Sequence, residues 1–170
     1  MGVGGAVRVI WLNGGVGSGK SAVGGALARL LPGSRFLDGD DLAGPRHLPN
    51  PVRWRMALDA LLRAVARRGR FRWLVIAYPL EADGFRRLRA AQGTARRFLT
   101  IVNLDAPLAM TLRGRGGRTL SPAEKDRVRV MRSKGCHRRP FATATLRNAY
   151  PPVGRTARRI LHLARSLPAG

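Results

Sequence analysis

The stretch from Trp11 to Ser21 constrains the fold of this chain more than any other. An apolar run over residues 7–12 leads into it, as expected of a strand buried in a parallel sheet. Apolar residues recur at helical spacing after Ser21, which predicts a helix there. Between the two lies the pattern G-x-x-x-x-G-K-[ST], at Gly14, Gly19, Lys20 and Ser21. A strand, this glycine loop and a helix in that order predict a P-loop, which binds the phosphates of a nucleoside triphosphate.

The residue types of the loop suit this ligand. Its glycines let the backbone curl so that successive N–H groups point at one phosphate, and the positive end of the following helix adds to the field. We expect Lys20 to reach the β- and γ-phosphates and to assist their transfer, and the Ser21 hydroxyl to bind Mg²⁺. The nucleotide-binding residues predicted in the loop are Gly14, Gly15, Gly17, Ser18, Gly19, Lys20 and Ser21.

Acidic residues are scarce, and three of the nine lie within residues 38–41. A short strand over residues 35–37 ends there, and ligands of α/β sheets gather at the carboxyl ends of strands. We expect Asp38 to bind the metal. Asp40 is expected to orient or deprotonate the hydroxyl that accepts the phosphate, with Asp41 beside the same acceptor. The alternative is a plain Asp-Gly turn in which Asp41 caps the next turn.

Arginines at two places are candidates for contacting the substrates. One pair stands at the start of a helix predicted over residues 51–68, near the expected acceptor. The other group lies in the glycine-rich segment 113–121, which we expect to form a lid over the triphosphate. The acceptor candidates are Arg53 and Arg55, and the lid arginines are Arg113, Arg115 and Arg118. In the lid, the first and last would stabilise the charge that develops during transfer, and the middle one would bind the nucleotide. For each arginine the alternative is a solvated surface side chain.

The remaining pattern alternates strands with helices. Ser121 and Glu124 form a capping box, which predicts a helix over residues 122–133. Asp105 is expected to cap a short helix that precedes this one.

The strand over residues 73–78 has no aspartate at its tip. The usual Walker B carboxylate is therefore missing, which argues against a motor or signalling NTPase. The other predicted strands cover 98–104 and 141–146, and the other helices cover 84–91, 106–112 and 157–167.

Composition limits the class of protein further. A length of 170 residues is typical of one domain, here 1–170. The chain has no apolar run long enough to span a membrane and a single cysteine, Cys136, so we expect a cytoplasmic protein without a disulfide framework. The net charge is +23, from 32 Lys and Arg against 9 Asp and Glu. The arginines are spread along the whole chain, which favours compositional drift over a specific nucleic-acid site, although nonspecific polyanion binding is expected.

The motifs resemble those of the small-molecule P-loop kinases, namely shikimate kinases, gluconate kinases and chloramphenicol phosphotransferases. The stretch Leu12–Gly15 is most similar to the last group, and Asp38–Asp41 to the first two. The resemblance implies a nucleoside-monophosphate-kinase-like α/β fold, with a five-stranded parallel sheet of order 2-3-1-4-5, helices on both faces and a short lid. It also implies ATP and Mg²⁺. The tip at residues 78–80 lacks the glycine cluster of shikimate kinases, and the residues after Asp41 lack the His-Pro run of gluconate kinases.

Together these patterns predict an ATP-dependent O-phosphotransferase that acts on a hydroxyl of a small metabolite or antibiotic. One alternative is a nucleoside or polynucleotide-end kinase, which the basic surface favours. Another is a non-catalytic binding protein that ATP switches between conformations. No base-reading motif is evident, so ATP and GTP both stay open.

Overall fold

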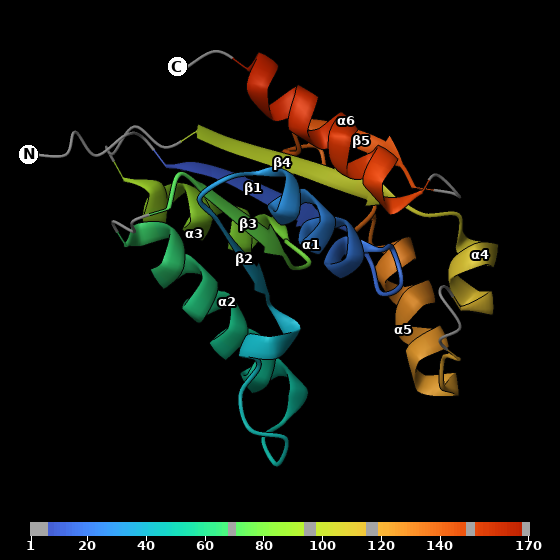
Figure 1. Cartoon of the computed structure of the whole chain (residues 1–170). Helices are drawn as coiled ribbons and strands as arrows, with labels where there is room; N and C mark the ends of the chain where they lie inside the picture. The colour runs from blue at the N-terminus through green and yellow to red at the C-terminus, as the bar shows by residue number, and fades with distance from the viewer. Residues whose placement is uncertain (1–6, 68–70, 94–97, 115–118, 149–151, 168–170) are drawn as a thin grey trace, which may run out of the picture.

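A single parallel sheet of five strands organises the chain (Figure 1). The computed structural model describes residues 7–67, 71–93, 98–114, 119–148 and 152–167. The strand order is β2-β3-β1-β4-β5, and each neighbouring pair runs parallel, as predicted. The strands are β1 (Arg8–Asn13), β2 (Ser34–Asp38), β3 (Trp73–Ala77), β4 (Phe98–Asp105) and β5 (Ala144–Arg147).

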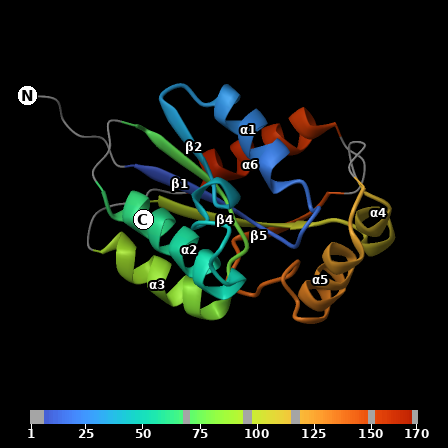
Figure 2. The same cartoon turned by 90° about the horizontal axis from the view of Figure 1, so that it is seen from below.

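Helices cover both faces of this sheet, which confirms the predicted fold class. Figures 1 and 2 show α1 (Lys20–Leu30) and α6 (Val153–Ser166) side by side on one face. On the opposite face lie α2 (Asn50–Ala66) and α3 (Ala82–Gln92). Two more helices, α4 (Leu108–Arg113) and α5 (Pro122–Ser133), stand beyond the carboxyl end of β4. In the described residues no helix combines the length and apolarity needed to span a bilayer.

The central strand β1 feeds two separate cores. Val9 and Trp11 point to the face covered by α2 and α3, while Ile10 and Leu12 point to the face covered by α1 and α6. This alternation follows from the two-residue repeat of a strand, and burial of both faces explains the unbroken apolar run in the sequence. Each fully buried side chain of this size contributes about 1.5–3 kcal/mol to stability. The two cores fix β1, and therefore the start of the glycine loop, from both sides.

The helix predicted over residues 122–133 has the same bounds in the structure. Its capping box is formed, with the Ser121 hydroxyl accepting from the Glu124 N–H at 3.2 Å and the Ser121 N–H donating to the Glu124 carboxylate at 2.9 Å. In contrast, β5 begins three residues later than predicted. The Phe141 ring instead stacks on Phe85 of α3, with ring centroids 4.4 Å apart.

Two adjacent glycines of α1 give a test of how this helix packs. A Cβ on Gly24 would collide with the Phe36 ring of β2, whereas a Cβ on Gly25 would come no closer than 3.8 Å to the Arg29 guanidinium. Gly25→Ala should raise the free energy of unfolding by about 0.5–1 kcal/mol, since alanine favours the helix. Gly24→Ala gains the same propensity but overpacks the interface, which costs about 1–3 kcal/mol. Urea unfolding of both variants measures the difference, and equal stabilities would contradict this packing of α1 on β2.

Candidate functional site

The glycine loop between β1 and α1 has the backbone that only glycine tolerates. Gly14, Gly17 and Gly19 have φ angles of 151°, 71° and 91°. A Cβ on Gly14 would lie 2.6 Å from the Ser18 hydroxyl oxygen and 2.9 Å from the Leu104 carbonyl oxygen. Both the conformation and the available space therefore require glycine at the first position of the motif.

Lys20 lies across this loop. Its ammonium group donates to the Gly15 carbonyl oxygen at 2.7 Å, so the side chain folds back over the loop. Burial lowers the pKa of Lys20 to about 8, although the nearby carboxylates of Asp40 and Asp38 act in the opposite direction. Ser21 follows in the first turn of α1 with an exposed side chain.

The acidic turn after β2 lies on the ring of Tyr78. Gly39 packs so closely against this ring that a Cβ there would collide with it. The Asp40 N–H donates to Asp38 Oδ1 at 3.1 Å, which holds the two aspartates on one tight turn. The charge of Asp40 acts on the pKa of both Lys20 and Tyr78. Asp41 is exposed in a single 3-10 turn, Asp40–Leu42.

Tyr78 is held as a neutral phenol. Its hydroxyl donates to the Trp54 carbonyl oxygen at 3.1 Å, and its own carbonyl oxygen accepts from the Trp11 indole at 2.8 Å. Burial, with a smaller contribution from Asp40, raises the pKa of Tyr78 to about 12. Tyr78 stands at the tip of β3, where a Walker B aspartate would be. Because these contacts hold its ring in place, the ring supports the acidic turn.

A cavity of about 480 Å³ opens beside Tyr78, between α2, α3 and α5. The contact of Arg55 with an acceptor stays a prediction, but Arg55 lines this cavity. Arg53 does not, because its guanidinium donates to the Gly44 carbonyl at 2.9 Å and to Asn50 at 3.2 Å. The lining residues are Trp54, Arg55, Leu58, Tyr78, Pro79, Leu80, Glu81, Asp83, Gly84, Arg87, Arg127, Val130, Met131 and Lys134.

Arg127 is a site residue that the sequence did not single out. Its guanidinium lies over the Trp54 ring, 4.2 Å from the centroid, and so bridges α5 and α2. Its charge also acts on the pKa of Lys20 and Tyr78. No sequence signal distinguishes it from the many other arginines, since only the packing of α5 brings it to the site.

The predicted lid is described only in part. Arg113 is the last residue of α4. Arg115 and Arg118 lie outside the described residues. The binding of the nucleotide by Arg115 and the stabilisation of the transferring charge by Arg118 therefore stay predictions.

Buried amides tie the glycine loop to the rest of the sheet edge. Asn13 Oδ1 accepts from the Leu80 N–H at 2.8 Å, and its amide nitrogen donates to Asn103 at 2.8 Å and to the Cys136 carbonyl at 3.2 Å. Asn148 donates to the Ser18 carbonyl at 2.7 Å, which holds the loop against the end of β5. These positions carry no motif, so the sequence alone did not reveal them.

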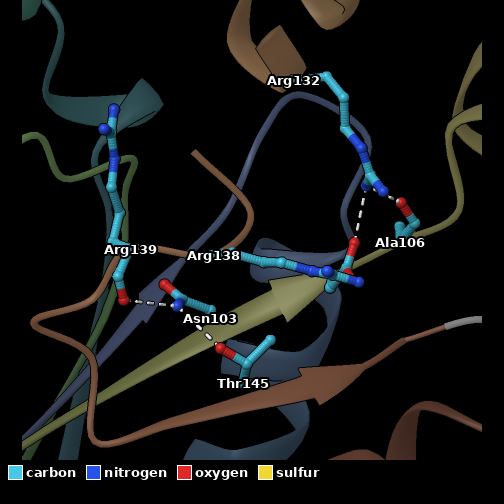
Figure 3. A network of polar contacts seen from close by, with 7 residues as sticks. Asn103, Ala106, Arg132, Arg138, Arg139 and Thr145 are labelled. Carbon is cyan, nitrogen blue, oxygen red and sulfur yellow. Dashed lines mark hydrogen bonds and ion pairs between the residues drawn. The ribbon is translucent and has the colours of Figure 1, made fainter. Parts of the chain in front are cut away.

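Asp105 anchors α5 rather than capping α4, which corrects the sequence-based expectation. Its carboxylate pairs with Arg132 at 2.7 Å and with Arg138 at 3.1 Å. Arg132 also donates to the Ala106 carbonyl at 3.0 Å (Figure 3). In the same view Asn103 donates to the Arg139 carbonyl and the Thr145 hydroxyl. Burial alone would raise the pKa of Asp105, but the hydrogen bonds from the two arginines outweigh it and lower that pKa.

The residues near Lys20 fit a magnesium ion that is shared with a triphosphate. Mg²⁺ usually keeps several waters and takes one or two protein ligands together with phosphate oxygens. Asp38 offers a carboxylate and Ser21 a hydroxyl, both next to the loop. The described residues contain no group of three or more His, Cys, Asp or Glu side chains that would hold a metal alone. The donor set therefore suits Mg²⁺ that arrives with the nucleotide.

No family model matches the sequence, and no curated protein matches it. Solved structures do match. A gluconokinase from Sinorhizobium meliloti 1021 has a TM-score of 0.68 at 22% identity, covering 93% of this chain and 91% of its own. An APS kinase from Mycobacterium tuberculosis, in complex with AMPPNP and APS, has a TM-score of 0.66 at 21% identity, covering 95% and 99%. A shikimate kinase from Acinetobacter baumannii, in complex with shikimate, has a TM-score of 0.65 at 18% identity, covering 96% and 97%. The chain therefore has the fold of the small-molecule P-loop kinases.

The Asp105 pairs predict a pH-dependent contribution to stability. Asp105→Asn should lower the free energy of unfolding by about 1–3 kcal/mol near neutral pH, because two arginines lose a charged partner. Since the folded-state pKa is depressed, this contribution is present above the unfolded value of about 3.9. It is lost as the pH falls through the folded value. Urea unfolding at a series of pH values measures it.

A matched control is Asp126→Asn, which breaks the exposed pair with Arg129. This change should cost less than about 0.5 kcal/mol at any pH. A cost for Asp105→Asn that matches this control would contradict the anchoring role of Asp105.

Proposed function

We propose that the protein is an ATP-dependent phosphotransferase that moves the γ-phosphate to a hydroxyl of a small molecule. The observation that carries this proposal is the position of Asp40. Its carboxylate acts on Lys20, which lies over the glycine loop, and on Tyr78, which lines the cavity. In this proposal a phosphate site at the loop and an acceptor site in the cavity adjoin at Asp40, because Gly39 before it packs on the Tyr78 ring that lines the cavity. The kinase names of the structural neighbours, one of them in complex with AMPPNP, support the same reaction.

In this proposal the chain supplies position and charge. The loop N–H groups and Lys20 hold the phosphates, and Asp40 accepts a hydrogen bond from the acceptor hydroxyl. The acceptor oxygen forms a bond to the γ-phosphorus as that phosphorus separates from the β,γ-bridging oxygen. ADP leaves, and the hydroxyl proton passes to Asp40 and then to water. Ser21 and Asp38 would hold Mg²⁺, which supplies charge neutralisation at the phosphates when bound. Arg113 and Arg118 would stabilise the transferring group.

The walled cavity supports a small acceptor over the end of a polynucleotide, because α2, α3 and α5 surround it. The proposal also includes a single domain over 1–170, a lid near 113–121, contact of Asp41 with the acceptor, and a cytoplasmic location. Nonspecific polyanion binding, expected from the net charge of +23, also stays a prediction.

Replacement of Asp40 tests the reaction. Asp40→Asn should lower the rate of phosphate transfer about 10²–10⁴-fold, because a positioned general base is lost. ATP affinity should stay within about twofold, since Lys20 and the loop are untouched. Transfer from γ-labelled ATP to a panel of hydroxyl compounds gives the rate, and calorimetry gives the affinity.

Asp41→Asn is the neighbouring comparison, with the same change of charge one residue away. It should raise the acceptor KM and leave kcat unchanged if Asp41 only contacts the acceptor. Full turnover in Asp40→Asn would reject Asp40 as the base. Tight ATP binding with no transfer to any compound by the unaltered protein would favour an ATP-switched binding protein.

A further inference from the structure

The wall of the cavity beside Tyr78 combines apolar and aromatic side chains with charged ones. Half of its fourteen lining residues are apolar or aromatic: Trp54, Leu58, Tyr78, Pro79, Leu80, Val130 and Met131. Among the residues that the structure describes, the lining contains no Ser, Thr, Asn, Gln or His side chain. The Tyr78 hydroxyl already donates to the Trp54 carbonyl. A ligand with many hydroxyl groups would find its side-chain partners here mainly among the charged residues, since Tyr78 is the one hydroxyl-bearing side chain of the described wall.

The charged residues of the wall leave an excess of positive charge. Its two acids already face arginines: Asp83 pairs with Arg86 at 3.0 Å, and Glu81 lies 3.9 Å from Arg139. The cavity arginine Arg87 likewise pairs with Asp59.

Three further cations line the same wall: Arg55, Arg127 and Lys134. None of the ion pairs among the described residues involves them, although all nine acids of the chain lie in the described part. A carboxylate or similar acid on the ligand would therefore meet unpaired cations.

The size and rim of the cavity indicate a ring system. Its volume of about 480 Å³ falls within the range of sites for drug-sized ligands. Two large apolar side chains at its edge stay open to solvent, Trp54 at 37% and Val130 at 50%. A flat ring could pack on this exposed apolar surface beside the Trp54 indole, over which the Arg127 guanidinium also lies.

We infer that the cavity takes a ring-bearing, mostly apolar alcohol that carries an acidic group. The hydroxyl faces Asp40 past Tyr78, the ring lies against Trp54, and the acid meets the cations of α2 and α5. The claim that this compound accepts the phosphate rests on the proposed function. The claim that the cavity binds it can be tested without turnover.

Three probes separate the features of the ligand. Hydroxymethylnaphthoate has the ring, the hydroxyl and the acid, hydroxymethylnaphthalene lacks the acid, and gluconate lacks the ring. Calorimetry with the full chain should show the first binding at least about tenfold more tightly than either of the others, since the naphthalene loses the charge-assisted contacts and gluconate loses the ring contacts. Gluconate binding as tightly as the naphthoate, or no measurable binding of the naphthoate, would overturn the inference.

Variants of the wall test the assignment of each contact. Arg55→Ala and Lys134→Ala should each weaken the naphthoate about three- to tenfold and leave the neutral naphthalene unchanged. Trp54→Ala should weaken both compounds, and Trp54→Phe should restore much of the loss because a ring surface returns. Arg63→Ala, an exposed change farther along α2, is the matched control and should alter neither affinity. Unchanged naphthoate affinity in both cation variants would overturn the inference.

Transfer from γ-labelled ATP keeps the two proposals apart. Binding of the naphthoate without transfer contradicts the proposed reaction and upholds the inference about the cavity. Transfer to gluconate, with the naphthoate unbound, upholds the reaction and overturns the inference.

Discussion

A single buried amide, that of Asn13, connects the parts of the chain that form the site. It sits where β1 ends and the glycine loop begins, and it is fully buried. Its oxygen holds the Leu80 N–H at the wall of the cavity, while its nitrogen holds Asn103 of β4 and the carbonyl of Cys136 after α5. Each buried group left without its partner would cost about 1–3 kcal/mol. The phosphate loop, the cavity wall and the end of α5 therefore take their positions from one side chain.

The few negative charges of the chain also lie at specific places in the fold. In a chain of net charge +23, two of the nine acids, Asp38 and Asp40, lie on one turn near Lys20. A third, Asp105, is matched by two arginines and holds α5 at the sheet edge. Asp40 is exposed and has no ion pair among the described residues, which is compatible with its proposed role as the base.

Patterns local in sequence predicted the fold well, and contacts between distant residues account for what they missed. Apolar runs located the four longest strands, and the capping box at Ser121 located α5 at its observed bounds. The strand order and the fold class came from the resemblance that the glycine loop and the acidic turn carry. Phe141 was assigned to β5 because alternation along the chain does not show that its ring stacks on Phe85.

For the site, the glycine loop and the acidic turn carry motifs, whereas the supporting residues do not. Arg53 and Arg55 are indistinguishable in sequence, and only the loop contact of Arg53 with Gly44 separates their roles. Arg127, Asn13 and Asn148 act through partners far along the chain.

The contact between Arg127 and Trp54 gives the two halves of the site a means of cooperation. The same guanidinium lies on the cavity wall and adds its field to Lys20. A ligand that draws Arg127 away from the indole also changes the potential at the loop. Thermodynamic reciprocity then requires phosphate groups at the loop to alter the affinity for that ligand by the same factor. In the proposed function, the stacked pair therefore couples the affinities for two molecules through one side chain.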